Sequence, residues 1–86
     1  MSLLEEVEQI LLGAGETRPA GQIGGFVVED GDGAVAVWWR TSLTVQLDAL
    51  RRFYLGRYAR TLLAAGFVVA HESGPEPHLV CTRPID

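Results

Sequence analysis

The sequence predicts an α+β fold in the order helix, two strands, helix, two strands, with both helices packed on one face of a four-stranded, mostly antiparallel sheet. Two segments space their apolar residues as helices do, one at the N-terminus and one in the middle of the chain. Each is followed by two short β-rich segments joined by turn residues. With 86 residues, 48% of them hydrophobic, the chain is long and apolar enough for one domain, residues 1–86, with a modest core.

The first helix is predicted from a capping box. Ser2 is followed three positions later by Glu5, so the two residues can satisfy two amide donors that a helix start leaves unpaired. Gly13 and Gly15 are expected to end the helix, and the polar, glycine-rich segment Glu16–Gly25 is expected to be a loop. The apolar side of the helix carries Leu3, Leu4, Val7, Ile10 and Leu11.

The strongest hairpin signal is the run of Asp and Gly at residues 30–33 between two β-rich arms. A turn at Gly31 and Asp32 would pair Glu29 with Ala34. Alternate residues then share a face of the sheet. One face carries Phe26, Val28, Val35, Val37 and Trp39, and the other carries Val27, Ala34, Ala36 and Trp38. The first set is bulkier, so we expect it to face the core.

A second helix is predicted from Ser42 or Thr44 to Ala65, with Gly66 as its cap. Gly56 lies in its middle, where glycine costs about 1 kcal/mol relative to alanine. Either another backbone approaches closely at this glycine, or the glycine has no structural role and the helix tolerates its small cost. The residues expected on the buried side are Leu47, Leu50, Tyr54, Tyr58, Thr61, Leu62 and Ala65.

A second hairpin is predicted from Phe67–Ala70 and His78–Thr82, joined across Glu72–Pro77. If His71 faces His78, one face of this hairpin carries one set of apolar residues and the other face carries another. The first set is Phe67, Val69 and Val80, and the second is Val68, Ala70, Leu79 and Cys81. Because neither face is polar, the sequence leaves open which of them is inward.

Two short matches indicate an internal repeat. The run LLGAG at residues 11–15 is similar to LLAAG at residues 62–66, and Phe-Val-Val occurs at residues 26–28 and again at 67–69. In a chain rich in Leu, Ala, Gly and Val, matches this short fit chance as well as duplication.

Trp38 and Trp39 are neighbours on one predicted strand, so their indoles point to opposite faces of the sheet. Two helices can cover only one face, which leaves Trp38 on an apolar surface. The favoured function is therefore a small, non-catalytic protein-binding or adaptor module. Its partner would be a second copy of the chain, giving a homodimer, or another protein. Trp38 is expected as the anchor of this interface, surrounded by Val27, Ala36, Val68 and Leu79.

Two other interpretations of this surface stay open. The loop Glu16–Gly25 or the C-terminal tail could fold over Trp38, or the surface could form a small-molecule pocket.

The alternative function is nucleic-acid binding by the second helix. Residues 49–71 contain four Arg and no acidic residue. On the outward side of this helix, basic side chains could hold phosphates and an aromatic ring could stack on a base. The net charge of −4 opposes this function, because it repels nucleic acid at a distance. The residues concerned are Arg52, Phe53, Arg57 and Arg60.

No cofactor, metal ion or catalytic residue is expected. His71, His78 and Cys81 do not follow a known metal-ligand spacing, and no serine lies in a nucleophile motif. Cys81 has no second cysteine to pair with and is expected to be a small buried hydrophobe. The acidic first helix lacks the positive charge of an export signal, and the longest apolar run, Leu62–Ala70, is too short to span a membrane. A cytoplasmic location without membrane contact is therefore expected.

Overall fold

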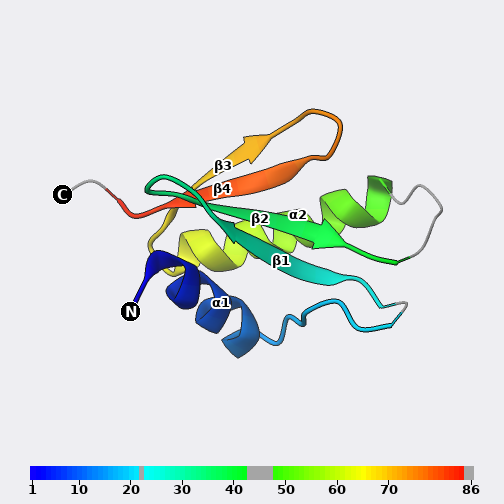
Figure 1. The fold of residues 1–86 in the computed structure, drawn as a ribbon, viewed down its shortest axis with the longest axis horizontal. Coiled ribbons are helices and arrows are strands. Elements are labelled where there is room, and N and C mark those ends of the chain that lie inside the picture. The colour runs from blue at the N-terminus through cyan, green and yellow to red at the C-terminus, as the bar shows by residue number, and fades with distance from the viewer. Residues whose placement is uncertain (22, 43–47, 85–86) are drawn as a thin grey trace.

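Two helices and a four-stranded antiparallel sheet make up the fold in a computed structural model that describes residues 1–21, 23–42 and 48–84 (Figure 1). The sheet has the spatial order β1-β2-β4-β3, and both helices pack on one of its faces, as the sequence predicts. In Figure 1 the strands cross in front of α2. The elements are α1 (Leu3–Gly13), β1 (Gly25–Asp30), β2 (Val35–Arg40), α2 (Asp48–Ala64), β3 (Val68–Glu72) and β4 (His78–Thr82).

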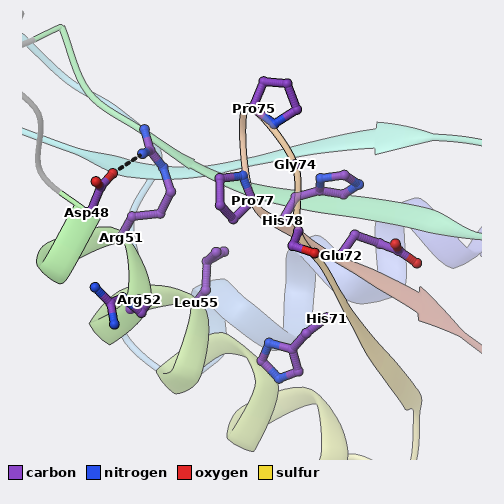
Figure 2. Close-up of a pocket in the computed structure, with 11 residues that line it drawn as sticks. Asp48, Arg51, Arg52, Leu55, His71, Glu72, Gly74, Pro75, Pro77 and His78 are labelled. Atoms are coloured by element: carbon purple, nitrogen blue, oxygen red, sulfur yellow. Dashed lines mark hydrogen bonds and ion pairs between the residues drawn. The ribbon is translucent and has the colours of Figure 1, made fainter.

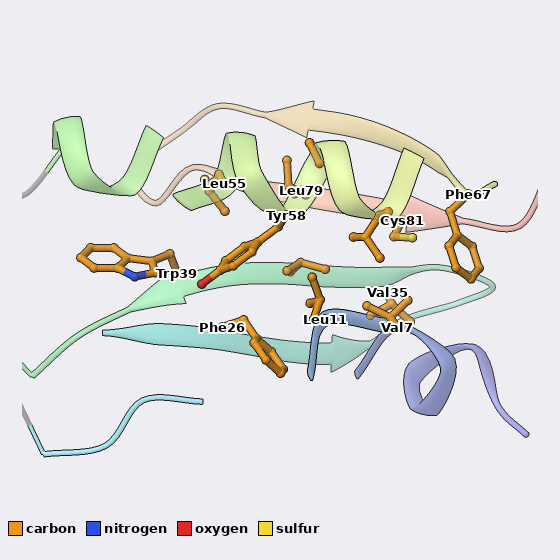
Figure 3. Close-up of a cluster of buried hydrophobic side chains, with 13 residues drawn as sticks. Val7, Leu11, Phe26, Val35, Trp39, Leu55, Tyr58, Phe67, Leu79 and Cys81 are labelled. Carbon is orange, nitrogen blue, oxygen red and sulfur yellow. The ribbon is translucent and has the colours of Figure 1, made fainter. Parts of the chain in front are cut away.

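The core lies between the helices and the sheet (Figure 3). Leu11 from α1 and Leu62 from α2 are fully buried against Val37 of β2 and Leu79 of β4. Burying an aliphatic side chain of this size stabilises a fold by about 1.5–3 kcal/mol. The other members of this cluster are Val7, Phe26, Val35, Trp39, Leu55, Tyr58, Ala59, Phe67 and Cys81.

Both helices end in the same way. Gly15 and Gly66 adopt positive φ angles of 90° and 95°, a conformation that favours glycine. The next residue in each case donates its amide back into the helix, Glu16 to the Leu11 oxygen at 3.0 Å and Phe67 to the Leu62 oxygen at 3.1 Å. These are Schellman motifs, and they confirm Gly66 as the cap of α2. The capping box of α1 is confirmed as well.

The first hairpin has the predicted faces in a different register. The structure pairs Glu29 with Ala36, not Ala34, because the chain turns over residues 31–34 and Gly33 takes the positive φ. A shift of two residues leaves every side chain on its face, since side chains alternate with a period of two. The bulkier set, including Trp39, therefore faces the core as expected.

The second hairpin differs from the predicted register by one residue. The structure pairs Glu72 with His78 and His71 with Leu79, whereas the sequence analysis placed His71 opposite His78. A shift of one residue moves the side chains of one strand to the opposite face of the sheet relative to those of its partner strand. Leu79 and Cys81 consequently share the helix-covered face with Val69, and both have no exposed surface. The prediction of Leu79 on the outward surface is therefore wrong.

Helix α2 is rotated relative to the predicted stripe. Leu55 and Ala59 are buried, whereas Leu50 is 44% exposed. Tyr54 keeps its predicted place facing the sheet, where its ring stacks on Trp39 with centroids 5.4 Å apart. Gly56 has no neighbouring atom within 4 Å of a Cβ added there, so it does not mark a close backbone approach. The predicted start at Thr44 and the predicted buried residue Leu47 lie outside the described residues.

The pairing of the four strands is symmetric about the centre of the sheet. The central strands β2 and β4 pair antiparallel, and the pair Ala36–Val80 lies midway between the pairs formed by Val35 with Cys81 and Val37 with Leu79. Rotation about Ala36–Val80 exchanges β2 with β4 and β1 with β3. The Phe-Val-Val runs and the two Schellman motifs occupy equivalent places in the two halves. The sequence repeat thus coincides with a symmetric arrangement of the four strands.

Candidate protein-binding surface

The face of the sheet opposite the helices is called the outer face here. It is formed by the residues that alternate with the buried ones along each strand. Its apolar residues are Val27, Ala36, Trp38, Val68, Ala70 and Val80, and its polar residues include Glu29, Arg40, Glu72, His78 and Thr82. Within the part of the chain that the structure describes, neither helix covers this face.

Trp38 lies near the middle of the outer face and is partly buried. His78, on the neighbouring strand β4, stacks on its indole with ring centroids 3.9 Å apart and an interplanar angle of 23°. The guanidinium of Arg40 lies 4.8 Å from the indole centroid, within cation–π range. Trp38 Nε1 is buried beneath these neighbours and has no hydrogen-bond acceptor among the described residues. The indole is therefore held in one orientation by surface side chains.

Arg40 is fixed in turn by acidic residues on both sides. Its Nε donates to Glu76 at 3.0 Å, and its Nη1 lies 3.7 Å from Glu29. The hydrogen bond to Glu76, opposed by partial burial, raises the pKa of the Arg40 guanidinium above its ordinary value. His78 Nδ1 lies 3.1 Å from the Glu76 backbone oxygen, a distance at which the ring N–H donates to that oxygen. The surroundings of Trp38 thus form one connected polar network.

The loop that could have covered Trp38 runs along the opposite side of the molecule. Glu16 is buried and forms an ion pair with Arg57 of α2 at 3.1 Å. The amide of Phe26 donates to the Thr17 oxygen at 3.0 Å, so the loop lies against the free edge of β1. A Cβ on Gly25 would come within 2.4 Å of the loop backbone, which confirms this close approach.

The C-terminal segment also lies on the helix side as far as it is described. Arg83, just after β4, forms an ion pair with Glu6 of α1. Neither of the two covering segments considered in the sequence analysis therefore lies over Trp38 in the described part of the chain.

Four of the five predicted interface residues share the outer face. Trp38 and Ala36 lie on β2 and Val27 on β1, all partly buried, while Val68 on β3 is 50% exposed. Leu79 is the exception, because it lies in the core. The sequence analysis missed Val80, which takes the place intended for Leu79. The shorter hairpin loop would have revealed it, since closing the loop by one residue exchanges the faces of β4.

The four residues of the nucleic-acid hypothesis differ in their exposure and in their contacts. Arg52 and Arg60 are exposed, and Phe53 is 54% exposed on the same helix. Arg57 instead holds the buried carboxylate of Glu16, so it is part of the structural framework. The predicted basic stripe is therefore reduced to Arg52 and Arg60.

Burial raises the pKa of the Cys81 thiol to about 11, so the reactive thiolate is scarce at neutral pH. Within residues 1–21, 23–42 and 48–84, no three His, Cys, Asp or Glu side chains gather as metal ligands. Over the same residues, no helix has the length and apolar character needed to cross a membrane.

Comparison with known proteins adds no assignment, because no family model, curated protein or solved structure matches this chain.

Proposed function

We propose that this protein is a non-catalytic protein-binding module that uses the outer face, with Trp38 as its anchor. The observation that carries the proposal is an apolar sheet face that is covered, in the described part of the chain, by neither helix, nor by the Glu16 loop, nor by the segment after β4. Contiguous apolar patches are uncommon on monomers and mark interaction sites more often than other surface does.

The composition of the outer face is typical of an interface centre. Tryptophan and arginine are the residue types most enriched among those that dominate binding energy. Stacking on His78 and the ion pairs of Arg40 hold Trp38 in place before a partner arrives, which reduces the entropy lost on binding. A partner that displaces Arg40 and offers a carbonyl oxygen would also satisfy the unpaired Trp38 Nε1.

A second copy of the chain is the occupant that we propose first. Four strands spaced about 4.8 Å apart, each rising about 3.3 Å per residue, give the outer face a footprint on the order of 300 Å². Stable complexes bury about 800 Å² on each partner. The homodimer should therefore be weak, with association in the micromolar range or above.

Charge makes the dimer's response to salt distinctive. Glu29, Glu72 and Glu76 surround the outer face, against the single cation of Arg40. Two copies brought face to face would repel each other through these carboxylates. Salt screens such repulsion, so dimerisation should strengthen as ionic strength rises.

Sedimentation velocity across the micromolar range tests this proposal. The wild type should gain mass with concentration, and Trp38→Ser should remain lighter while keeping the wild-type circular dichroism spectrum. Phe53→Ser is the matched control, because it removes an exposed aromatic residue from α2, away from the outer face. A wild type that stays monomeric excludes a second copy. If Trp38→Ser then also captures the same proteins as the wild type from a host lysate, the whole proposal is overturned.

The competing function, nucleic-acid binding, gives the opposite salt response. If it holds, mixed DNA or RNA should shift in a gel, the shift should weaken steeply with salt, and Arg52→Glu with Arg60→Glu should abolish it. Its support is the exposure of Arg52, Phe53 and Arg60.

A further inference from the structure

A cavity of about 850 Å³ opens between the first turns of α2 and the loop that joins β3 to β4 (Figure 2). In this view Leu55 of α2 lies at the centre of the cavity, and Pro75 and Pro77 belong to the loop that faces α2. The cavity opens on the helix side of the sheet, and two residues of the outer face, Glu72 and His78, also line it. Its volume falls in the range of small-molecule sites.

The charged groups around the cavity are unevenly distributed. Arg51 and Arg52 come from α2, and His71 comes from the helix-facing side of β3. Two acidic residues also line the cavity, Asp48 and Glu72. The Glu72 side chain belongs to the outer face, and in Figure 2 it points away from Leu55. Asp48 is therefore the one carboxylate on the helix side among the described lining residues.

Arg51 is anchored but not fully hydrogen bonded. Its Nη1 lies 3.5 Å from Asp48, at the limit of a hydrogen bond, and its guanidinium carbon lies 6.0 Å from the Trp39 ring centroid. The side chain is only 22% exposed, and its Nε is buried without a hydrogen-bond partner in the described chain.

Arg52 has no ion pair or hydrogen bond to any other described residue. The described lining thus carries two guanidiniums and two imidazoles, and its one carboxylate on the helix side is weakly engaged, by Arg51 alone. An oxyanion is the ligand group that guanidinium donors match best.

We propose that this cavity binds a small anionic ligand. A carboxylate or phosphate group would be held by Arg51 and Arg52, with His71 as a further donor. The apolar part of the ligand would rest on Leu55 and Pro77. The paired lining of charge and apolar surface is the usual form of a ligand site, in which a few polar groups orient a largely apolar molecule.

NMR titration of the ¹⁵N-labelled protein tests the proposal with three probes at constant ionic strength, namely inorganic phosphate, phenyl phosphate and benzoate. Amide shifts should concentrate at residues 51–55 and 71–77. Phenyl phosphate or benzoate should bind more tightly than phosphate alone because of the apolar floor. The better of these two probes identifies the oxyanion.

Arg52→Gln should weaken binding about tenfold, because a hydrogen bond to a charged group is lost. Arg60→Gln is the matched control, since it removes the same charge from the same helix, outside the cavity. Its affinity should equal that of the wild type. Arg51→Gln provides a second variant, with its fold checked through the Trp39 indole resonance.

Two results would overturn the proposal. One is the absence of localised shifts with millimolar concentrations of all three probes. The other is equal weakening by Arg52→Gln and Arg60→Gln, which would show that only the general charge of α2 attracts anions. Probe binding is measured by amide shifts at residues 51–55 and 71–77, whereas the outer-face proposal is measured by sedimentation, so either proposal can fail without the other.

Discussion

Trp38 and Trp39 show what one position along a strand decides. Trp39 is 3% exposed, stacks on Tyr54 and lies against Gly24, where an added Cβ would come within 2.4 Å of the indole. Trp38, one residue earlier, lies on the outer face among His78 and Arg40. The same side chain thus stabilises the core at one position and forms the candidate interface at the next.

Cys81 gives a prediction at the residue scale. Its pKa is raised from about 9 to about 11 by burial, so above pH 9 the unfolded chain releases the thiol proton before the folded chain does. The stability contribution is therefore complete below pH 9 and is lost as pH rises toward 11. The free energy of unfolding should fall by about 2–3 kcal/mol over this interval.

Urea unfolding at pH 8 and at pH 11 measures this loss. Cys81→Ala should show a smaller decrease between the two pH values, whatever its stability at pH 8. Some decrease should remain, since burial also raises the pKa of Tyr58. An identical decrease in wild type and variant would contradict the assignment to Cys81.

At the scale of the element, the two glycines of the second helical segment have opposite roles. Gly56 lies inside α2, and Gly66 follows its end with a φ of +95°. Neither has an atom within 4 Å of an added Cβ, so steric contact does not distinguish them. Only backbone conformation does.

Gly56→Ala should raise the free energy of unfolding by about 1 kcal/mol, because alanine is the better helix former. Gly66→Ala should lower it by about 1–2 kcal/mol, because an L-residue is strained at this φ. Thermal or urea unfolding of the two single variants and the double variant checks both signs. Stabilisation by Gly66→Ala would mean that the Schellman motif does not form in solution.

Strand register is also decided at the element scale. The first hairpin was predicted two residues out of register and kept its faces, whereas the second was one residue out and moved Leu79 from the outer face to the core. The loop residues alone do not determine the register of the strands that they join. The burial of Leu79 and Cys81 beneath α2 determines the register of the second hairpin, because exposing both side chains would lower the free energy of unfolding by several kcal/mol.

At the scale of the whole molecule, the segment that follows β4 lies against α1, the first helix of the chain. The segment after β4 reaches α1 through Arg83 and Glu6, as the segment after β2 reaches α2. Joining Asp86 to Met1 would therefore create a second connection of the kind that already links β2 to α2.

A circular permutant with its ends joined in this way and opened within residues 43–47 should fold, with a free energy of unfolding within about 2 kcal/mol of the wild type, since it keeps both hairpins and both Schellman motifs. Circular dichroism and urea unfolding measure this. The control permutant, opened between Ala65 and Gly66, interrupts a Schellman motif and should be less stable. If the first permutant is unfolded while the control folds, the proposed equivalence of the two connections is wrong.

The sequence by itself determined the order of the elements, the capping box of α1, the glycine that ends α2 and the faces of the first hairpin, because these depend on turn residues and on periodicities within a few residues. It also placed four of five candidate interface residues on one surface. Only the tertiary structure decided the register of the second hairpin, the rotation of α2 that buries Leu55 and Ala59, and the path of the Glu16 loop to Arg57. Each of these is set by contacts between residues far apart in the chain. The free energy of such contacts cannot be inferred from local sequence patterns.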